Sequence, residues 1–489
     1  MKQDNKFNML SFTGKMKILH LSWMAFFITF VVWFNHAPLL GLIAKSLNIS
    51  MAEVKTLLIL NVALTIPARI IIGMLTDKFG PRLTYSFLLF AGSIPCFWFA
   101  FATDFAQLAM ARLLLGFVGA GFVIGIRMVS EWFPANELGT AEGIYGGWGN
   151  FGSAAAAILL PTIALFFGGD DGWRYAAGFS GLICLAFSFV WYTNVTDSPK
   201  GSTYFKSKKM GGLEVTSKGD FFFLLLMKLP MYIALVLVTW KLSPHGVALI
   251  SASAASGVYA ILAAILVYDC FSVYKVNKEI FHTPVPEIQR YQFKQVAAVN
   301  ILYFTTFGSE LAVVSMLPMF FADVYKLDMV YAGLAGSVFA IMNLIARPYG
   351  GWLSDHFGRK KTLMFVIVGL AAGYCAMSMI TSAWPLLLAV LVVITCSFCV
   401  QAGCGAVFAV VPLIKRRLTG QIAGMTGAYG NTGGVFFLTV LSFVDYSTFF
   451  LVIAATAILG IMAILFMNEP RGHMAEINDD GTVELIKVS

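Results

Sequence analysis

The chain has 489 residues, of which 59% are hydrophobic and only 12% are charged. One or two soluble domains could not hide this much apolar surface, so the composition excludes a soluble protein and indicates an integral membrane protein. The formal net charge of +8 reflects basic loops on one side of a membrane, and we expect no nucleic-acid partner.

Uninterrupted apolar runs recur along the chain, each about as long as the roughly 20 residues that a helix needs to cross a bilayer. A transmembrane β-barrel would show shorter segments of alternating hydrophobicity, so the runs predict an all-α polytopic membrane protein. The predicted spans number fourteen and cover about residues 18–43, 54–76, 83–102, 106–131, 138–167, 174–194, 220–240, 246–271, 295–322, 330–353, 362–381, 384–412, 418–443 and 447–467.

Lysine and arginine gather in alternate loops of this arrangement. The opposite loops carry isolated charges such as Asp104, Lys241 and Lys326. Because cytoplasmic loops are enriched in basic residues, the pattern predicts a multi-pass plasma-membrane protein with both termini in the cytoplasm. The basic loops lie at 77–82, 200–218, 275–294, 356–361 and 415–417.

The chain contains an internal repeat. Arg69 and Asp77 in the second predicted span return as Arg347 and Asp355, in both cases 278 residues later. Two parallel six-helix halves around a site near the midplane form the plan of many secondary transporters. The repeat predicts one bundle at 1–195, a second at 295–470, an inserted helix pair with its loops at 196–294, and a cytoplasmic tail at 471–489.

The repeated arginines are the strongest functional signal. Arg69 precedes Asp77 by eight residues, which places it roughly 12 Å inside the helix end in a bilayer core about 30 Å thick. A guanidinium keeps its proton and offers a planar fork of donors that suits a small planar oxyanion. We therefore expect Arg69 and Arg347 to bind an anion between the halves. The alternative is that carboxylates neutralise both arginines, and Glu310 is the one well-buried acid that we identify for them.

Other polar residues fall inside predicted spans. Tyr303 and Glu310 share one face of the seventh span, where Tyr303 can donate to a substrate and Glu310 can act either as an arginine counter-ion or as a proton carrier. His36 can titrate or can simply be hydrogen-bonded. Arg127 and Glu131, one helical turn apart, are expected to pair with each other.

The fifth span of each half is rich in glycine. Most of these glycines are expected to permit close helix packing. Asn150 and Asn431 lie at matching positions of the two glycine runs, 281 residues apart, and their amides can donate to an anion beside bare backbone.

Two motifs carry a resemblance to a known family. The loops from Gly73 through Asp77 to Arg82, and from Gly351 through Asp355 to Arg359, resemble the signature loop of the major facilitator superfamily, which implies a gating role. The arginine in each second span, with Gly-x-Gly-Asn-x-Gly type runs in each fifth span, resembles the nitrate/nitrite porter family, most of all its cyanobacterial members. The resemblance implies that Arg69 and Arg347 clamp the anion and that the pocket is lined by Tyr303, Asn150, Gly146, Asn431 and Gly427.

These observations predict a secondary active transporter that imports nitrate, and also nitrite as a second substrate, in symport with protons. A nitrate/nitrite exchanger and a facilitator for another small anion, such as an organic carboxylate, remain alternatives. The chain lacks His-Glu-x-x-His, Gly-x-Ser-x-Gly and phosphate-loop motifs, so we expect no enzyme activity, and we expect neither cofactor nor metal. The expected partners are nitrate, nitrite, protons and the lipid bilayer.

Overall fold

The computed structural model describes most of the chain. The described residues are 7–50, 53, 57, 60–62, 64–202, 204–207, 211–246, 248, 250–327, 329–470, 472–477 and 483–487. The predicted second span starts at 54, so much of its first turns lies outside the described residues, as do parts of the predicted tail at 471–489.

Almost all described elements are helical. The first half contains α1 (Gly14–Phe34), η1 (Ala37–Leu39), α2 (Leu40–Leu47), α4 (Thr65–Phe79), α5 (Pro81–Phe101), α6 (Phe105–Leu115), η2 (Gly116–Ala120), α7 (Gly121–Trp132), α8 (Ala135–Asn150), α9 (Gly152–Phe167) and α10 (Gly172–Asn194). The middle segment contains α11 (Lys218–Leu242), α12 (Ala252–Asn277), η3 (Lys278–Phe281) and η4 (Glu287–Gln289).

The second half repeats the helical plan of the first. It contains α13 (Phe293–Tyr325), α14 (Met329–Ile341), α15 (Asn343–Phe357), α16 (Arg359–Ser378), α17 (Leu386–Phe408), η5 (Val411–Leu413), η6 (Arg416–Leu418), α18 (Thr419–Val440) and α19 (Tyr446–Phe466). A short antiparallel hairpin follows, in which β1 (His473–Ile477) pairs with β2 (Val483–Lys487). The expected tail is therefore partly ordered as a hairpin.

Within the described residues, 12 helical stretches are long and apolar enough to cross a membrane. The predicted spans at 330–353 and 418–443 are helical but are not among them. The first is divided at Met342 into α14 and α15, of 13 and 15 residues. The second is α18, in which glycine and polar residues replace large apolar side chains.

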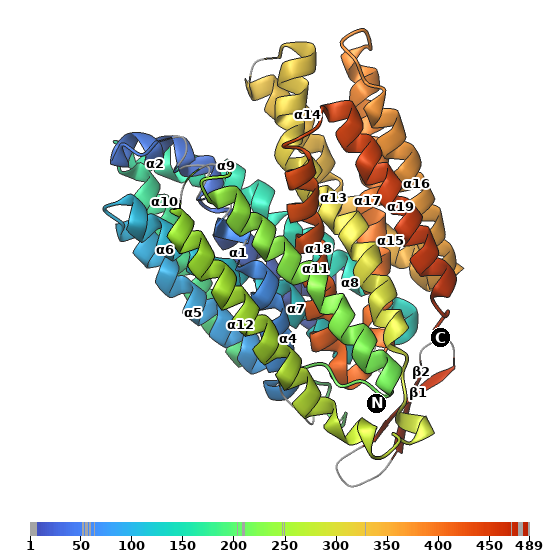
Figure 1. The fold of residues 1–489 in the computed structure, drawn as a ribbon. Coiled ribbons are helices and arrows are strands. Elements are labelled where there is room, and N and C mark those ends of the chain that lie inside the picture. Colours follow the sequence, from blue (N-terminus) through green and yellow to red (C-terminus); the bar gives the residue numbers. More distant parts are fainter. Residues whose placement is uncertain are drawn as a thin grey trace.

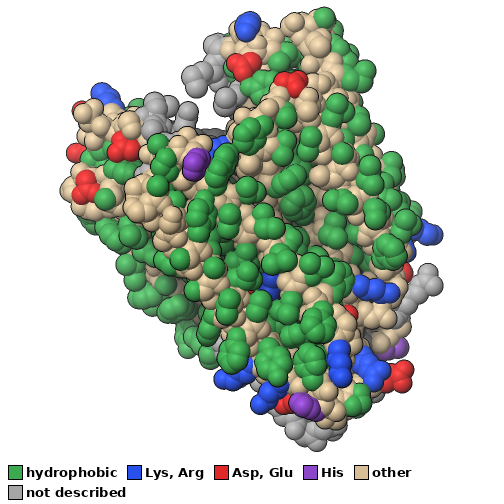
Figure 2. All heavy atoms as spheres, viewed as in Figure 1, with side chains coloured by type: hydrophobic (Ala, Val, Ile, Leu, Met, Phe, Trp, Pro, Cys, Tyr) green, Lys and Arg blue, Asp and Glu red, His purple; other side chains and the backbone are tan. Residues whose placement is uncertain are grey.

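Two helical bundles lie side by side in Figure 1, with α1 to α10 in one and α13 to α19 in the other. The inserted helices α11 and α12, drawn in green, lie along the outside, where α11 contacts α13 and α18. Both ends of the chain lie at one end of the bundle, beside the hairpin. Apolar side chains cover the flank of the molecule, and lysine and arginine gather at the end that carries the termini (Figure 2). This surface suits a protein surrounded by lipid.

The halves contact each other through two pairs of helices, and each pair takes one helix from each half. Helix α15 packs against α8 of the other half, and α18 packs against α4. A Cβ atom added to Gly143 would lie 2.5 Å from the carbonyl oxygen of Arg347, and one added to Gly424 would lie 2.4 Å from that of Arg69. Because these distances leave no room for a side chain, glycine is required at both contacts, and the repeated arginines are brought to the interface.

Candidate functional site

The two repeated arginines meet between the halves. Arg69 on α4 and Arg347 on α15 are buried, with 1% and 2% of their surface exposed. Their guanidinium carbons lie 5.3 and 5.5 Å from the centre of the same ring, that of Phe307 on α13. A second ring, that of Phe122 on α7, lies 5.7 Å from the guanidinium of Arg69. The aromatic rings thus hold both cations at one place through cation–π contacts.

The two arginines differ in their partners. A nitrogen of Arg347 lies 2.6 Å from a carboxylate oxygen of Glu310, and the other oxygen of Glu310 accepts a hydrogen bond from Asn343 at 2.8 Å. Arg69 donates to the carbonyl oxygen of Gly427 at 2.7 Å, while its Nε has no hydrogen-bond partner among the residues that the structure describes. In the described part of the chain no carboxylate pairs with Arg69. The site therefore carries one positive charge that no neighbouring acid neutralises.

Several buried polar atoms near the arginines have no hydrogen-bond partner among the described residues. They include the hydroxyl of Tyr303 and both amide atoms of Asn150 and of Asn431, all on residues at most 5% exposed. The Tyr303 ring stacks on Phe307 with centroids 4.9 Å apart, which fixes its position. Unpaired buried polar groups are costly, and a bound polar ligand is a common reason for them.

The predicted pocket glycines lie beside the arginines of the opposite half. A Cβ atom on Gly146 would lie 3.4 Å from Nη1 of Arg347, and one on Gly427 would lie 2.9 Å from Cδ of Arg69. These two glycines therefore leave space for the guanidinium groups, whereas Gly143 and Gly424 serve the packing of the helices.

The aspartates of the two signature loops join the halves at the end that carries the termini. Asp77 accepts hydrogen bonds from the backbone N–H groups of Gly420 and Gln421, both at 2.8 Å. Asp355 accepts from the N–H groups of Gly139 and Thr140 at 2.9 and 2.7 Å. Each carboxylate thus accepts hydrogen bonds from backbone amides near the N-terminus of α18 or α8, where helix dipoles favour negative charge.

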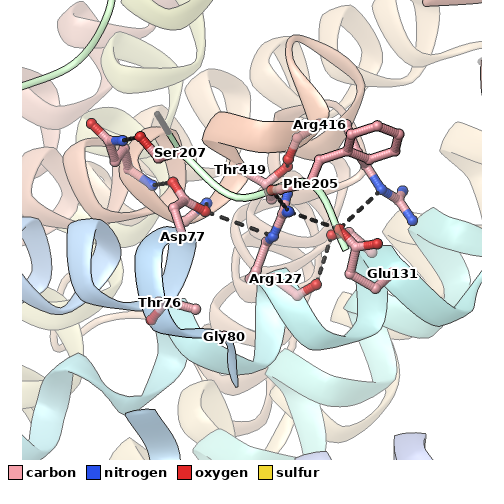
Figure 3. Close-up of polar contacts among 12 residues, drawn as sticks. Thr76, Asp77, Gly80, Arg127, Glu131, Phe205, Ser207, Arg416 and Thr419 are labelled. Carbon is pink, nitrogen blue, oxygen red and sulfur yellow. Dashed lines mark hydrogen bonds and ion pairs between the residues drawn. The ribbon is translucent and has the colours of Figure 1, made fainter. Parts of the chain in front are cut away.

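A network of charges extends from Asp77 (Figure 3). Arg127 lies between Asp77, at 3.7 Å, and Glu131, at 2.9 Å. The expected pair of Arg127 with Glu131 is therefore confirmed. Glu131 also lies 3.4 Å from Arg416 of the other half. Arg127 donates to the carbonyl of Phe205 at 2.8 Å, so the segment after α10 is built into the network.

The basic residues of the two signature loops behave differently. Arg359 crosses the interface and donates to the carbonyl of Ala135 at 2.7 Å. Arg82 instead donates through Nε to the carbonyl of Tyr192 and through its backbone N–H to Asp197, at 2.8 and 2.7 Å. Tyr192 belongs to the same half as Arg82, and Asp197 follows that half in the chain, so among the described residues these bonds of Arg82 do not reach the second half.

His36 is buried, and neither of its ring nitrogens has a hydrogen-bond partner among the described residues. The nearby charge that acts on it is Arg112. Asn61, which the sequence places on one face of the helix with Arg69, accepts two hydrogen bonds from Arg112 at 3.0 and 2.6 Å. The structure therefore groups His36 with Arg112 rather than with the two arginines of the site.

Sequence reasoning missed two buried charges. Arg112 is fully buried and is held by neutral oxygens of Asn35, Asn61 and Trp33. Glu142 on α8 is 2% exposed. Glu310, the buried acid expected to be available to the two arginines, pairs with Arg347, and Glu142 and Asp77 are further buried acids. A charge within an apolar run, the signal that marked Arg69, could have identified Arg112.

Comparison with known proteins places this architecture in a family. Residues 22–277 and 299–486 match the model of the Major Facilitator Superfamily. The human organic anion transporter MFSD10 (TETRAN) has the same fold, with a TM-score of 0.64 at 11% identity over 92% of this chain and 100% of that one. The proton:xylose symporter XylE gives a TM-score of 0.60 at 16% identity over 93% and 96% of the two chains. The fold is thus that of a membrane transporter of this superfamily.

Curated relatives narrow the assignment. The nitrate/nitrite transporter NrtP of Nostoc punctiforme is 44% identical over 96% of this chain and 95% of its own length. NrtP of a Picosynechococcus strain is also 44% identical, over 97% of both chains. The probable nitrate/nitrite antiporter NarK1 of Thermus thermophilus is 24% identical over 86% and 83% of the two chains. The chain belongs to the major facilitator superfamily and, within it, to the nitrate/nitrite porter family.

Proposed function

We propose that the protein is a secondary active transporter that imports nitrate and nitrite across the plasma membrane. The observation that carries the proposal is the buried charge of Arg69, which lacks an acidic partner in the described chain and lies beside Arg347 at the interface of the halves. The names of the NrtP relatives support nitrate and nitrite as the substrates.

The chemistry of the site suits a small planar oxyanion. Arg69 offers a planar fork of donors, and the hydroxyl of Tyr303 and the amides of Asn150 and Asn431 are buried donors without partners in the described part of the chain. A bound nitrate would accept hydrogen bonds from these groups and would balance the remaining positive charge. Glu310 is already paired with Arg347, which supports its role as a counter-ion rather than as a mobile proton carrier.

We propose that the chain crosses the membrane fourteen times, with α11 and α12 inserted between two six-helix halves. The gathering of basic residues at the end with the termini supports a cytoplasmic position for that end. In this orientation the links of Asp77 and Asp355 join the halves on the cytoplasmic side. Release of the anion inward then requires both links to break as the halves rock.

Import also requires an energy source. Moving one negative charge inward against an inside-negative potential costs about 2.3 kcal/mol per 100 mV. Symport with one proton removes this electrical cost, and symport with two protons reverses its sign. We therefore propose proton-coupled uptake, in which alternating access carries the anion and the protons inward together.

The test is uptake of labelled nitrate by purified protein in liposomes under an imposed pH gradient. Arg69→Lys and Arg347→Lys keep the charge but lose the planar fork, so both variants should lose most uptake while remaining folded. Normal uptake by both variants would reject the two-arginine site. Competition separates the substrate classes, because nitrite should inhibit uptake, whereas a larger carboxylate such as lactate should not.

Nitrate/nitrite exchange is the second candidate. It is favoured by the likeness to the Thermus protein, whose name describes a probable antiporter. An exchanger would take up labelled nitrate only into liposomes preloaded with nitrate or nitrite and would carry no current. An inward current on addition of nitrate at low external pH would instead support symport with more than one proton.

A further inference from the structure

A buried acid lies between the anion site and the cytoplasmic links. Glu142 on α8 is 2% exposed, and neither of its carboxylate oxygens accepts a hydrogen bond within the described chain. Burial of an ionised carboxylate without hydrogen bonds is costly, and gain of a proton removes that cost. Other acids at the interface are already engaged, since Glu310 holds Arg347, Asp355 accepts hydrogen bonds from the backbone of α8, and Asp77 accepts them from the backbone of α18.

The position of Glu142 relates it to transport. It precedes Gly146 by one helical turn, and the site that a Cβ of Gly146 would occupy is 3.4 Å from Nη1 of Arg347. Residues four apart share a helix face, so Glu142 lies roughly 6 Å further toward the end with the termini. On the same helix, Gly139 and Thr140 bind Asp355. Glu142 therefore lies along α8 between the arginines and the cytoplasmic link.

The internal repeat indicates that packing does not need this carboxylate. At the offset of 281 residues, Gly143, Gly146 and Asn150 correspond to Gly424, Gly427 and Asn431. Glu142 corresponds to Ala423, which is also fully buried. The same helix contact is thus made in the other half with a methyl group. A buried acid that only one repeat carries calls for a role other than packing.

Several elements near Glu142 carry titratable groups. Arg416 of η6 acts on it electrostatically, and Arg416 also lies 3.4 Å from Glu131. Helix α9 carries no titratable residue. The titratable residues of α8 itself and of the other helices packed against it are Glu137 and Tyr145 on α8, Lys15, Lys17 and His20 on α1, Arg127 and Glu131 on α7, Arg347, Tyr349, Asp355 and His356 on α15, and Cys396, Cys399 and Cys404 on α17.

We propose that Glu142 carries the proton that accompanies the anion, an inference that rests on the proton-coupled transport proposed above. When Glu142 is ionised, its negative charge opposes movement of the anion toward the cytoplasmic end. A hydronium ion on the outer side loses a proton and becomes water as one of its O–H bonds breaks, an O–H bond forms on the carboxylate, and the repulsion disappears. After the halves rock, the O–H bond breaks and the proton passes to cytoplasmic water, while the anion leaves by the same side.

Two modes of transport in liposomes test this role. Net uptake driven by a pH gradient needs the proton cycle, whereas exchange of labelled for unlabelled nitrate at equal pH does not. With one proton per anion, the parent should accumulate nitrate about tenfold per pH unit of gradient. Glu142→Gln should retain exchange but show the same net uptake with and without the gradient. The matched control is Glu137→Gln on the same helix, which should behave as the parent.

Glu142→Ala provides a second neutral variant, because alanine already occupies the equivalent position of the other half. A further measurement needs no transport: nitrate added to weakly buffered, detergent-purified parent should cause proton uptake, and neither variant should show it. The proposal is overturned if a neutral variant keeps the gradient response, or if exchange and gradient-driven uptake fall together in a folded variant. Failure of the parent to move nitrate in either mode would instead reject the proposed function.

Discussion

Arg69 on α4 donates a hydrogen bond to the carbonyl oxygen of Gly427 on α18, 2.7 Å away across the interface of the two halves. A neutral carbonyl satisfies one donor but does not neutralise the guanidinium. The equivalent arginine, Arg347, is neutralised by Glu310 at 2.6 Å. The pseudo-symmetric site is therefore electrically asymmetric, and this asymmetry gives rise to the predictions below.

Removal of the counter-ion should increase the effect of nitrate on stability. Glu310→Gln leaves Arg347 buried without its acid, and loss of one partner from a buried ion pair typically costs about 3–5 kcal/mol. The variant should therefore melt at a lower temperature than the parent. A bound anion would partly replace the missing charge, so nitrate should raise the melting temperature more in the variant than in the parent. An equal shift in both proteins would contradict a shared anion site.

The glycines beside the arginines should differ in their tolerance of a methyl group. Gly427→Ala places a Cβ atom 2.9 Å from Cδ and 3.0 Å from Nη1 of Arg69, and Gly146→Ala places one 3.4 Å from Nη1 of Arg347. Overpacking of this kind costs about 1–3 kcal/mol. We expect nitrate uptake to fall at least about tenfold for Gly427→Ala and less for Gly146→Ala. The reverse order would show that these contacts do not set the position of the guanidinium groups.

The links made by Asp77 and Asp355 should control access to the site from the end that carries the termini. Asp77→Asn weakens the hydrogen bonds to Gly420 and Gln421, and bonds to charged groups contribute about 1.5–3 kcal/mol each. We expect the variant to spend more time open on the side of the termini. Ser354 on α15 is fully buried, so a Ser354→Cys probe should react faster with a thiol reagent when Asp77→Asn is also present. Because the chain has seven native cysteines, the reaction of the thiol reagent with protein that keeps Ser354 gives the background rate.

The inserted helices should be held together by an ion pair. Lys228 on α11 is 5% exposed and lies 2.8 Å from a carboxylate oxygen of Asp269 on α12, which also accepts from the hydroxyl of Tyr232 at 3.1 Å. Asp269→Asn leaves the lysine unpaired and should lower the melting temperature, because an unpaired charge is costly there. Lys228→Met combined with Asp269→Asn should recover much of the loss. Additive losses in the double variant would indicate that the two groups act separately.

The sequence predicted the architecture because its signals are local and repeated. Apolar runs marked the helices, and Arg69 and Arg347 fell at matching positions of two copies, which placed them at a common interface. The matching glycines account for the packing of α4 against α18 and of α15 against α8, since the close backbone contacts require them. What the sequence could not decide was which arginine Glu310 would meet, because that depends on the relative placement of α13 and α15.

Other features of the site depend on contacts between distant segments. The role of Phe205 in binding Arg127 could not be predicted, since the segment after α10 has no periodic pattern. Glu142 lies near the start of the predicted fifth span, within its glycine-rich part, and its burial became evident only when α7, α15 and η6 were placed around it. Arg112 had the same sequence signal as Arg69, but its partners Asn35 and Asn61 come from separate segments.

Equilibrium binding of nitrate to the purified protein tests the central claim most directly. Binding depends on the unneutralised charge of Arg69 and does not require the transport cycle. Titration of the parent, of Arg69→Gln and of the matched control Arg112→Gln would separate a binding arginine from a structural one. We expect Arg69→Gln to abolish nitrate binding, whereas folded Arg112→Gln should still bind. Nitrate binding by Arg69→Gln with the affinity of the parent would contradict the account.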